Sequence, residues 1–233
     1  GNDSARQWRH LFAVSPFVAA HVVQQPSRLQ KLGDDLAASF DKNSLTQTLQ
    51  QQLLSIDDAA QFDQQIRQSR NEQMALIASR DILGQATLEQ TLANLSGLAD
   101  MLIDICLRWQ YEKLAHRHGY PLRSDGEPMP LVVLGMGKLG AQELNYSSDI
   151  DLILAYEEDG KTTGPAVVSH HDFFTRLTQR FFQSLNKTTA DGFVFRVDLR
   201  LRPYGNSGPM VMSFGAMEEY YQTQGREWER YAM

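Results

Sequence analysis

Residues 131–156 read LVVLGMGKLGAQELNYSSDIDLILAY and contain the pattern that decides the fold of this chain. The apolar run at 131–135 predicts a strand that enters a glycine-rich turn, and the run at 150–156 predicts a second strand. Side chains two positions apart in a strand share a face, so Asp149 and Asp151 should project together. Two such carboxylates at the start of a strand indicate a divalent-metal site that meets a phosphate group.

The glycine turn supplies the second part of the predicted site. A short helix is expected over 137–146, and its first N–H groups and positive dipole end should face a phosphate. Glycines let the backbone approach such a group because they lack a Cβ, and hydroxyls just before the acids can donate to its oxygens. The residues expected to bind phosphate or nucleotide here are Gly135, Gly137, Lys138, Ser147 and Ser148.

A third acid is expected from a later strand over 193–201, where Asp198 lies in the sequence RVDLRLRP. Strand alternation would place Arg196, Asp198, Arg200 and Arg202 on one face. Three arginines around an acid suit a metal-bound anion better than an apolar core. We therefore predict a site with Asp149, Asp151 and Asp198 as catalytic metal ligands, and with the three arginines as further anion ligands.

Two nucleotide-binding motifs fit this stretch less well. The glycines at 135, 137 and 140 match G-x-G-x-x-G, and Glu157 lies where a ribose ligand is wanted. However, the interval 141–149 is too short for the crossover helix of a parallel βαβ unit, and paired acids would repel a pyrophosphate. The P-loop pattern fails because Ala141 occupies the position of its lysine.

Each part of the pattern also has a purely structural interpretation. Asp149 and Asp151 alone are compatible with a strand cap plus a surface acid, and the strand at 193–201 with a solvated edge. His170 and His171 begin an amphipathic helix over 170–185 and are interpreted as surface residues. Taken together, the glycine turn, the acids and the arginines favour the metal–phosphate interpretation.

The composition describes an acidic chain without a disulfide framework. Lys plus Arg is 22 and Asp plus Glu is 28, so the net charge of −6 lacks the basic footprint of a nucleic-acid-binding protein. Cys106 is the single cysteine and is predicted to be a core thiol. We find no signal peptide and no apolar run of about 20 residues. We therefore expect a cytoplasmic protein that binds neither nucleic acid nor membrane.

Helix signals dominate the first half of the chain. Helix starts are predicted at Ser15 before Pro16, at Ser55 with Asp58, and at Thr87 with Gln90. Apolar residues then recur at helical spacing from Leu88 to Gly119, which predicts one helix of about 30 residues.

The domain organisation follows from these composition changes. We predict an α+β chain with a helical region (1–119), a linker (120–130), a catalytic core with a mixed sheet and flanking helices (131–212), and the start of a truncated C-terminal helical region (213–233). Gly1 in place of methionine, and an end at Met233 inside a continuing pattern, lead us to expect a piece of a longer protein.

Long motifs in this sequence resemble a known enzyme family. The glycine turn followed by D-I-D, with a third acid on a later strand, is similar to the nucleotidyltransferase superfamily of DNA polymerase β. More closely, GMGKLGAQELNYSSDIDL (135–152) and FVFRVDLRLRPYGNSGPMVMS (193–213) resemble the glutamine synthetase adenylyltransferase family, as does SPFVAAHVVQQP (15–26). The resemblance implies a polymerase-β-like mixed sheet behind a helical region.

The resemblance also implies an activity. That family carries two homologous halves, of which one attaches AMP to glutamine synthetase and the other removes it. The motifs at 135–137, 145–151 and 225–231 look like those of the removing half, which implies metal-dependent phosphorolysis of adenylyl-tyrosine to ADP. The implied cofactor is Mg²⁺ or Mn²⁺, and the implied partners are glutamine synthetase, the signal protein PII, ATP or ADP, and phosphate. The attaching half and a non-catalytic regulatory module that docks PII remain the alternatives.

Overall fold

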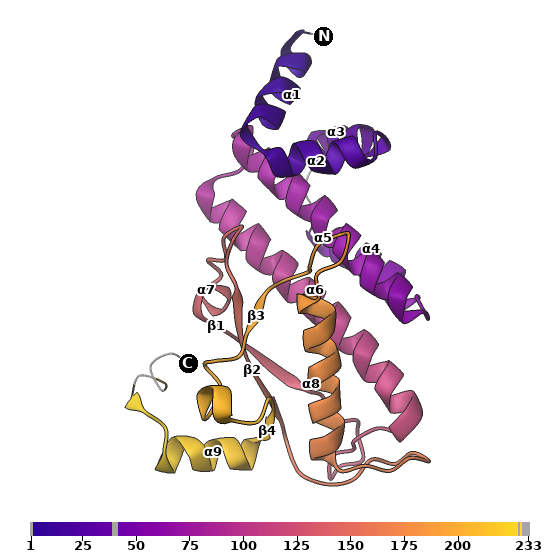
Figure 1. Cartoon of the computed structure of the whole chain (residues 1–233), viewed down its shortest axis with the longest axis vertical. Helices are drawn as coiled ribbons and strands as arrows, with labels where there is room; N and C mark the ends of the chain where they lie inside the picture. Colours follow the sequence, from indigo (N-terminus) through magenta and orange to yellow (C-terminus); the bar gives the residue numbers. More distant parts are fainter. Residues whose placement is uncertain (1, 39–41, 228, 230–233) are drawn as a thin grey trace. The chain divides into compact units, whose positions relative to one another are not determined.

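The computed structural model describes residues 2–38, 42–227 and 229, which combine helices with a small mixed sheet of four strands (Figure 1). The chain divides into two compact units, residues 1–102 and 103–233. The division falls within α6 (Leu88–His118), so this helix contributes to both units. The predicted α+β fold class, with helices flanking a mixed sheet, is confirmed.

The described part of the first unit is entirely helical. Its elements are α1 (Asn2–Val14), α2 (Pro16–Gln24), α3 (Ser27–Ala37), α4 (Lys42–Leu54), α5 (Ala59–Ile82) and the beginning of α6. Most of the predicted starts are confirmed: Ser15 Oγ accepts from Val18 N–H at 3.2 Å, and Thr87 and Gln90 exchange hydrogen bonds. The start of α5 differs, because Asp58 caps it alone while the Ser55 hydroxyl donates to a backbone oxygen of the preceding helix.

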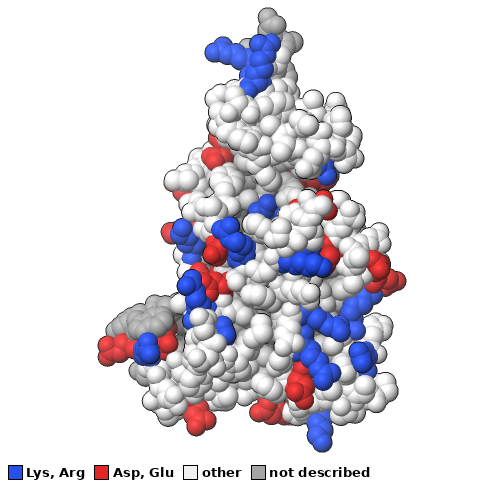
Figure 2. Space-filling view, viewed as in Figure 1, with Lys and Arg blue, Asp and Glu red and all other residues white. Residues whose placement is uncertain are grey.

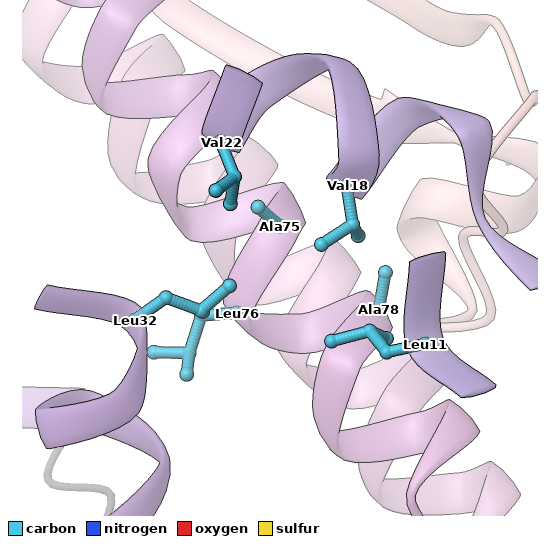
Figure 3. Packing of buried hydrophobic residues seen from close by; sticks show 7 residues of the cluster. All are labelled: Leu11, Val18, Val22, Leu32, Ala75, Leu76 and Ala78. Atoms are coloured by element: carbon cyan, nitrogen blue, oxygen red, sulfur yellow. The ribbon is translucent and has the colours of Figure 1, made fainter. Parts of the chain in front are cut away.

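Small residues on α5 let three short helices pack closely against it. Alanine side chains at 75 and 78 flank Leu76, and aliphatic side chains from α1, α2 and α3 converge on this surface (Figure 3). The cluster consists of Leu11, Val18, Val22, Leu32, Ala75, Leu76 and Ala78. Each fully buried aliphatic side chain contributes about 1.5–3 kcal/mol, so this cluster is the cohesive centre of the helices that surround it.

The sheet of the second unit is organised around β2 (Ile150–Tyr156). β1 (Val132–Met136) pairs with it antiparallel along its length. β3 (Val197–Asp198) pairs parallel with the beginning of β2, and β4 (Met212–Ser213) pairs parallel with its end. Because β1 and β2 are antiparallel, the unit contains no dinucleotide-binding βαβ crossover at the glycine turn, in agreement with the sequence argument.

The helix α8 (His170–Asn186) packs onto this sheet through aromatic residues. The rings of Tyr156 and Phe174 stack with centroids 4.9 Å apart, and Phe173 meets Tyr111 of α6 edge-on at 5.4 Å. A buried hydrogen bond of 2.9 Å joins Gln110 of α6 to Ser184 of α8. The shorter elements of the unit are α7 (Gly137–Gly140), the 3-10 turn η1 (Gly205–Ser207) and α9 (Phe214–Thr223).

The predicted burial of Cys106 and of the two histidines can be compared with their burial in the second unit. Cys106 is completely buried, as predicted. His170, predicted at the surface, is only 2 % exposed, and its ring nitrogens lie 2.9 and 3.2 Å from the carbonyl oxygens of Glu158 and Lys161. That prediction was wrong because the turn before α8 folds over the ring, whereas His171 is exposed as expected.

None of the helices in the described residues is both long enough and apolar enough to cross a membrane.

Candidate active site

The beginning of β2 brings the two predicted acids of this strand next to the third. All residues of β2 are buried except Asp151, which is half-buried at the open end of the strand. Asp151 pairs in register with Met136 of β1 on one side and with Asp198 of β3 on the other. Asp149 lies just before the strand, where the Ile150 N–H donates to the Arg196 carbonyl at 2.9 Å. The structure therefore gathers Asp149, Asp151 and Asp198 at one edge.

Two glycines allow the turn before this edge to close tightly. Gly137 has a left-handed φ of +54°, and a Cβ there would lie 3.0 Å from Oδ2 of Asp151. A Cβ on Gly140 would lie 2.5 Å from the carbonyl oxygen of Gly135. The first position thus lets the backbone approach the central acid, and the second lets the turn fold back on itself.

The helix expected over 137–146 is much shorter than predicted. α7 ends at Gly140, and Gln142 has a left-handed φ of 58° that a continuing helix excludes. A single helical turn has little macrodipole, so α7 supplies less of the positive end that the predicted phosphate site was expected to use. The side chain of Lys138 is exposed on the glycine turn.

The side chain of Asn145 organises the two predicted serines, a role that the sequence analysis missed. Its Oδ1 accepts hydrogen bonds from the Ser147 N–H at 3.2 Å, from the Ser147 hydroxyl at 3.4 Å and from the Ser148 hydroxyl at 2.7 Å. This is an asparagine turn that presents the backbone leading into Asp149. The sequence signal for this turn is an asparagine followed by serines two and three positions later, which could have identified the role of Asn145.

Arg196 and Asp149 form the first of two ion pairs at the site. The Arg196 Nε lies 2.5 Å from Asp149 Oδ1, and its Nη2 donates to the Ser147 carbonyl at 2.7 Å. The guanidinium also lies over the Phe193 ring, 5.6 Å from its centroid. Arg196 therefore joins the segment before β3 to the segment before β2.

Arg200 and Asp198 form the second ion pair. The Arg200 backbone N–H donates to Oδ1 of Asp198 at 2.8 Å, and its Nε donates to Oδ2 at 2.6 Å. Both oxygens of this carboxylate are thus engaged by one residue. Neither of the two ion pairs includes Asp151.

The strand expected over 193–201 is also shorter than predicted, and its arginines do not alternate along one face. β3 contains only Val197 and Asp198, and the chain then turns through residues 200–204. Within this turn Arg202 donates to backbone carbonyls, that of Leu199 at 2.8 Å and that of Gly208 at 3.3 Å. Arg202 therefore braces the turn itself, while Arg196 and Arg200 contact the acids.

The acids differ in their electrostatic surroundings. Partial burial and the neighbouring carboxylates of Asp198 and Asp149 raise the pKa of Asp151, against the opposing effect of Arg200. Hydrogen bonds from Arg200 hold the pKa of Asp198 below its ordinary value, and the same contact raises the pKa of Arg200. Asp151 is therefore the carboxylate whose negative charge is least compensated.

The donor set suits a hard divalent cation, although the arginines now hold two of the acids. Carboxylate oxygens on neighbouring backbone positions are the ligands that Mg²⁺ and Mn²⁺ prefer. As the side chains stand, no group of three His, Cys, Asp or Glu residues within the described ranges is close enough to hold an ion. Basic and acidic residues lie side by side on the face shown in Figure 2, and two of the acids at the site, Asp149 and Asp198, are paired with arginines.

Known proteins are similar to this chain over nearly its whole length. The profile of the family described as glutamate-ammonia ligase adenylyltransferase matches residues 5–233. A bifunctional glutamine synthetase adenylyltransferase/adenylyl-removing enzyme of Shewanella loihica is 44% identical over 232 residues, which cover 99% of this chain. The proteins of the same name from Pseudomonas aeruginosa and Vibrio parahaemolyticus are 46% and 42% identical, over 99% and 100% of the chain.

The match covers only part of each relative. The chain spans 24% of the length of the Shewanella loihica and Pseudomonas aeruginosa proteins and 25% of the Vibrio parahaemolyticus protein. The family assignment itself rests on nearly the whole of this chain. The chain belongs to the glutamate-ammonia ligase adenylyltransferase family.

Proposed function

We propose that this chain removes AMP from glutamine synthetase by phosphorolysis. An oxygen of inorganic phosphate attacks the phosphorus of an adenylyl-tyrosine, a new phosphorus–oxygen bond forms, and the bond to the tyrosine oxygen breaks. The products are ADP and the tyrosine side chain, whose phenolate takes up a proton. The relatives' shared name includes both an attaching and an adenylyl-removing activity, and the motifs at 135–137 and 145–151 favour removal.

The single observation that supports this proposal most directly is the register of β2 and β3. It sets Asp151 beside Asp198, with Asp149 one residue before the strand. Three carboxylates gathered at an edge, with arginines at the same place, suit a reaction in which an anion must be held near a metal-bound phosphorus. Asp151, the least compensated of the three acids, contributes no ion pair with Arg196 or Arg200 that would explain it as a structural residue.

In this proposal Asp149, Asp151 and Asp198 hold one or two divalent cations, Mg²⁺ or Mn²⁺. When bound, such a cation neutralises charge at phosphorus and aligns the attacking and leaving oxygens. The chain's own part is to position these oxygens, since positioning and charge stabilisation carry most of the catalysis in transfer at phosphorus.

The attacking phosphate is proposed to lie against the basic residues at the same edge. Arg196 and Arg200 emerge beside the acids, and Lys138 is exposed on the glycine turn. These cations attract an anion that the net charge of −6 would otherwise repel. The serines ordered by Asn145 and the glycine backbone would complete the contacts to phosphate oxygens.

The proposed partners follow from the reaction. Glutamine synthetase is the protein substrate, and PII is proposed as the regulator that sets the direction of the cycle. Because the substrate is an enzyme of nitrogen assimilation, we propose that the chain acts in the cytoplasm. No contact with nucleic acid or membrane is part of the proposal.

The proposal is tested by incubating this chain with adenylylated glutamine synthetase and Mg²⁺, with and without phosphate, and measuring ADP. We expect ADP only when phosphate is present, and none from Asp151→Asn. A parallel reaction offers unmodified glutamine synthetase and ATP. Transfer of AMP in that reaction would show that the chain is the attaching half. If neither ADP release nor AMP transfer is detected in any reaction, a non-catalytic regulatory module would be favoured.

A further inference from the structure

The two arginines that contact the acids occupy positions where a metal ion would need to bind. Arg196 holds Oδ1 of Asp149, and Arg200 holds both oxygens of Asp198. The guanidinium groups hold Oδ1 of Asp149 and Oδ2 of Asp198, while the Arg200 backbone N–H holds Oδ1 of Asp198; a cation bound between the acids would compete with the guanidinium groups for the first two oxygens. The proposed function, however, also requires positively charged side chains that bind the attacking phosphate.

We propose that Arg196 and Arg200 are exchangeable counter-ions that couple metal binding to phosphate binding. Arg196 neutralises Asp149, and Arg200 neutralises Asp198. When a divalent cation takes the carboxylates, the guanidinium groups are released and become the ligands of the phosphate anion. This inference rests on the proposed function and assigns a regulation to the same site.

The exposure of the two pairs permits this exchange. The side chains of Arg196 and Asp149 are 53% and 50% exposed, and that of Arg200 is 73% exposed. Ion pairs with this much solvent contact are weak, but the Asp198 side chain is only 14% exposed, so its pair with Arg200 is the better shielded of the two. Both guanidinium groups border solvent and can reorient through it; Arg196 must then also leave the Ser147 carbonyl, which it contacts at 2.7 Å.

Arg202 shows the contrast on the same segment. Its guanidinium donates to the backbone carbonyls of Leu199, Asn206 and Gly208. If the Arg202 guanidinium moved away from these carbonyl oxygens, the turn would lose the hydrogen bonds that stabilise it. Arg202 is therefore held by backbone carbonyls, whereas the Arg200 side chain pairs with Asp198 and the Arg196 side chain contacts both Asp149 and the Ser147 carbonyl.

The charge balance explains why the two ligands should bind together. Three carboxylates and two arginines leave a formal charge of about −1 at the edge. A divalent cation alone would leave both arginines without their counter-ions, and phosphate alone would compete with the acids for them. When both are bound, the metal ion pairs with the carboxylates and the phosphate pairs with the arginines that the carboxylates have released. By reciprocity, phosphate must raise metal affinity by the same factor as the metal raises phosphate affinity.

The first experiment measures Mn²⁺ binding to the chain by electron paramagnetic resonance of the free ion. Arg196→Gln and Arg200→Gln remove a competitor, so each should bind Mn²⁺ about two- to fivefold more tightly than wild type. Lys138→Gln removes the same charge from the glycine turn, but Lys138 is in neither pair, so it measures the general electrostatic effect. Arg196→Lys and Arg200→Lys keep an ion pair and should bind like wild type.

The second experiment repeats these titrations with inorganic phosphate. Phosphate should raise the Mn²⁺ affinity of wild type severalfold, and this increase should be lost when both arginines are replaced by glutamine. Complexation of Mn²⁺ by phosphate in the buffer is identical for every variant and cancels in the comparison. Thermal unfolding of each variant verifies that it is folded.

Two results would overturn the inference. One is that the glutamine variants bind Mn²⁺ no more tightly than Lys138→Gln does. The other is that phosphate raises Mn²⁺ affinity equally in wild type and in the double variant. Neither result depends on turnover, so failure of the exchange is distinguishable from failure of the proposed reaction, which would appear as normal binding without ADP.

Discussion

Asp151 and Asp198 are direct partners in the parallel pairing of β2 with β3. Their side chains leave neighbouring strands at the same level, so each carboxylate lies in the field of the other. Asp198 is compensated by Arg200, whereas Asp151 is not part of an ion pair with either arginine. This asymmetry leads to the first two predictions.

Asp151→Asn and Asp198→Asn should each reduce phosphorolysis by about 100-fold or more, because each removes a proposed ligand of the metal. The measurement is the rate of ADP release at saturating Mg²⁺ and phosphate. Asp104→Asn is the matched control, since Asp104 forms an exposed arginine pair on α6 at 3.0 Å. Full activity in both site variants would exclude the metal assignment.

The stability of these two variants should depend on pH in opposite directions. The pKa of Asp151 is raised, so the folded state binds its proton more tightly and the ionised acid weakens the fold at neutral pH. Asp151→Asn should therefore be more stable than wild type at pH 7, and the difference should vanish as the pH falls below the ordinary value of 3.8.

Asp198 has a lowered pKa, so its ionised form contributes stability above pH 3.8 that is lost as the pH falls. Asp198→Asn should be less stable than wild type at pH 7 by up to about 1 kcal/mol, and equal to it in acid. Urea unfolding midpoints measured across this pH range test both variants. Differences that do not change with pH would contradict the assigned shifts.

Gly137→Ala should impair the site beyond its effect on stability. A left-handed residue other than glycine costs about 1–2 kcal/mol, and the new Cβ would lie 3.0 Å from Oδ2 of Asp151 and push this carboxylate aside. Gly126→Ala is the matched control, because its φ is +88° and a Cβ there meets nothing within 4 Å.

Both glycine variants should lose similar stability in thermal unfolding, but only Gly137→Ala should weaken Mn²⁺ binding. Equal metal affinity in the two would mean that the close approach to Asp151 has no role in the site.

Asn145→Ala should disorder the turn that leads into Asp149. The change removes the acceptor shared by Ser147 and Ser148 and should cost about 1 kcal/mol of stability. We expect a higher KM for phosphate. Asn145→Asp keeps the acceptor oxygen and should restore the stability, so the two variants separate the turn from the amide itself. Unchanged KM in the alanine variant would argue against a positioning role.

Local sequence determined the elements whose signals lie within a few residues. The strand at 150–156 and the helix from Leu88 to His118 occur where predicted, since an unbroken apolar run and a long helical period leave few alternatives. The caps at Ser15 and Thr87 were predictable because each depends on residues within three positions of the helix start.

The failures occurred where partners distant in sequence decide the conformation. The alternation of RVDLRLRP suggested a long strand, but β2 pairs with only two of its residues, and Arg202 finds backbone carbonyls across a turn instead. The prediction for His170 failed because residues 158–161 cover it. In the motif at 225–231, Trp228, Arg230 and Tyr231 lie outside the described residues, so the likeness of this motif to the removing half stays a prediction.

For the site, the sequence by itself determined which residue types are present and that Asp149 and Asp151 are near one another. Only the tertiary structure decided that Asp198 stands beside Asp151, and that Arg196 and Arg200, but not Arg202, hold the acids. The physical reason is that strand register and side-chain ion pairs join segments about 50 residues apart, and no local period encodes which of several arginines reaches a given carboxylate.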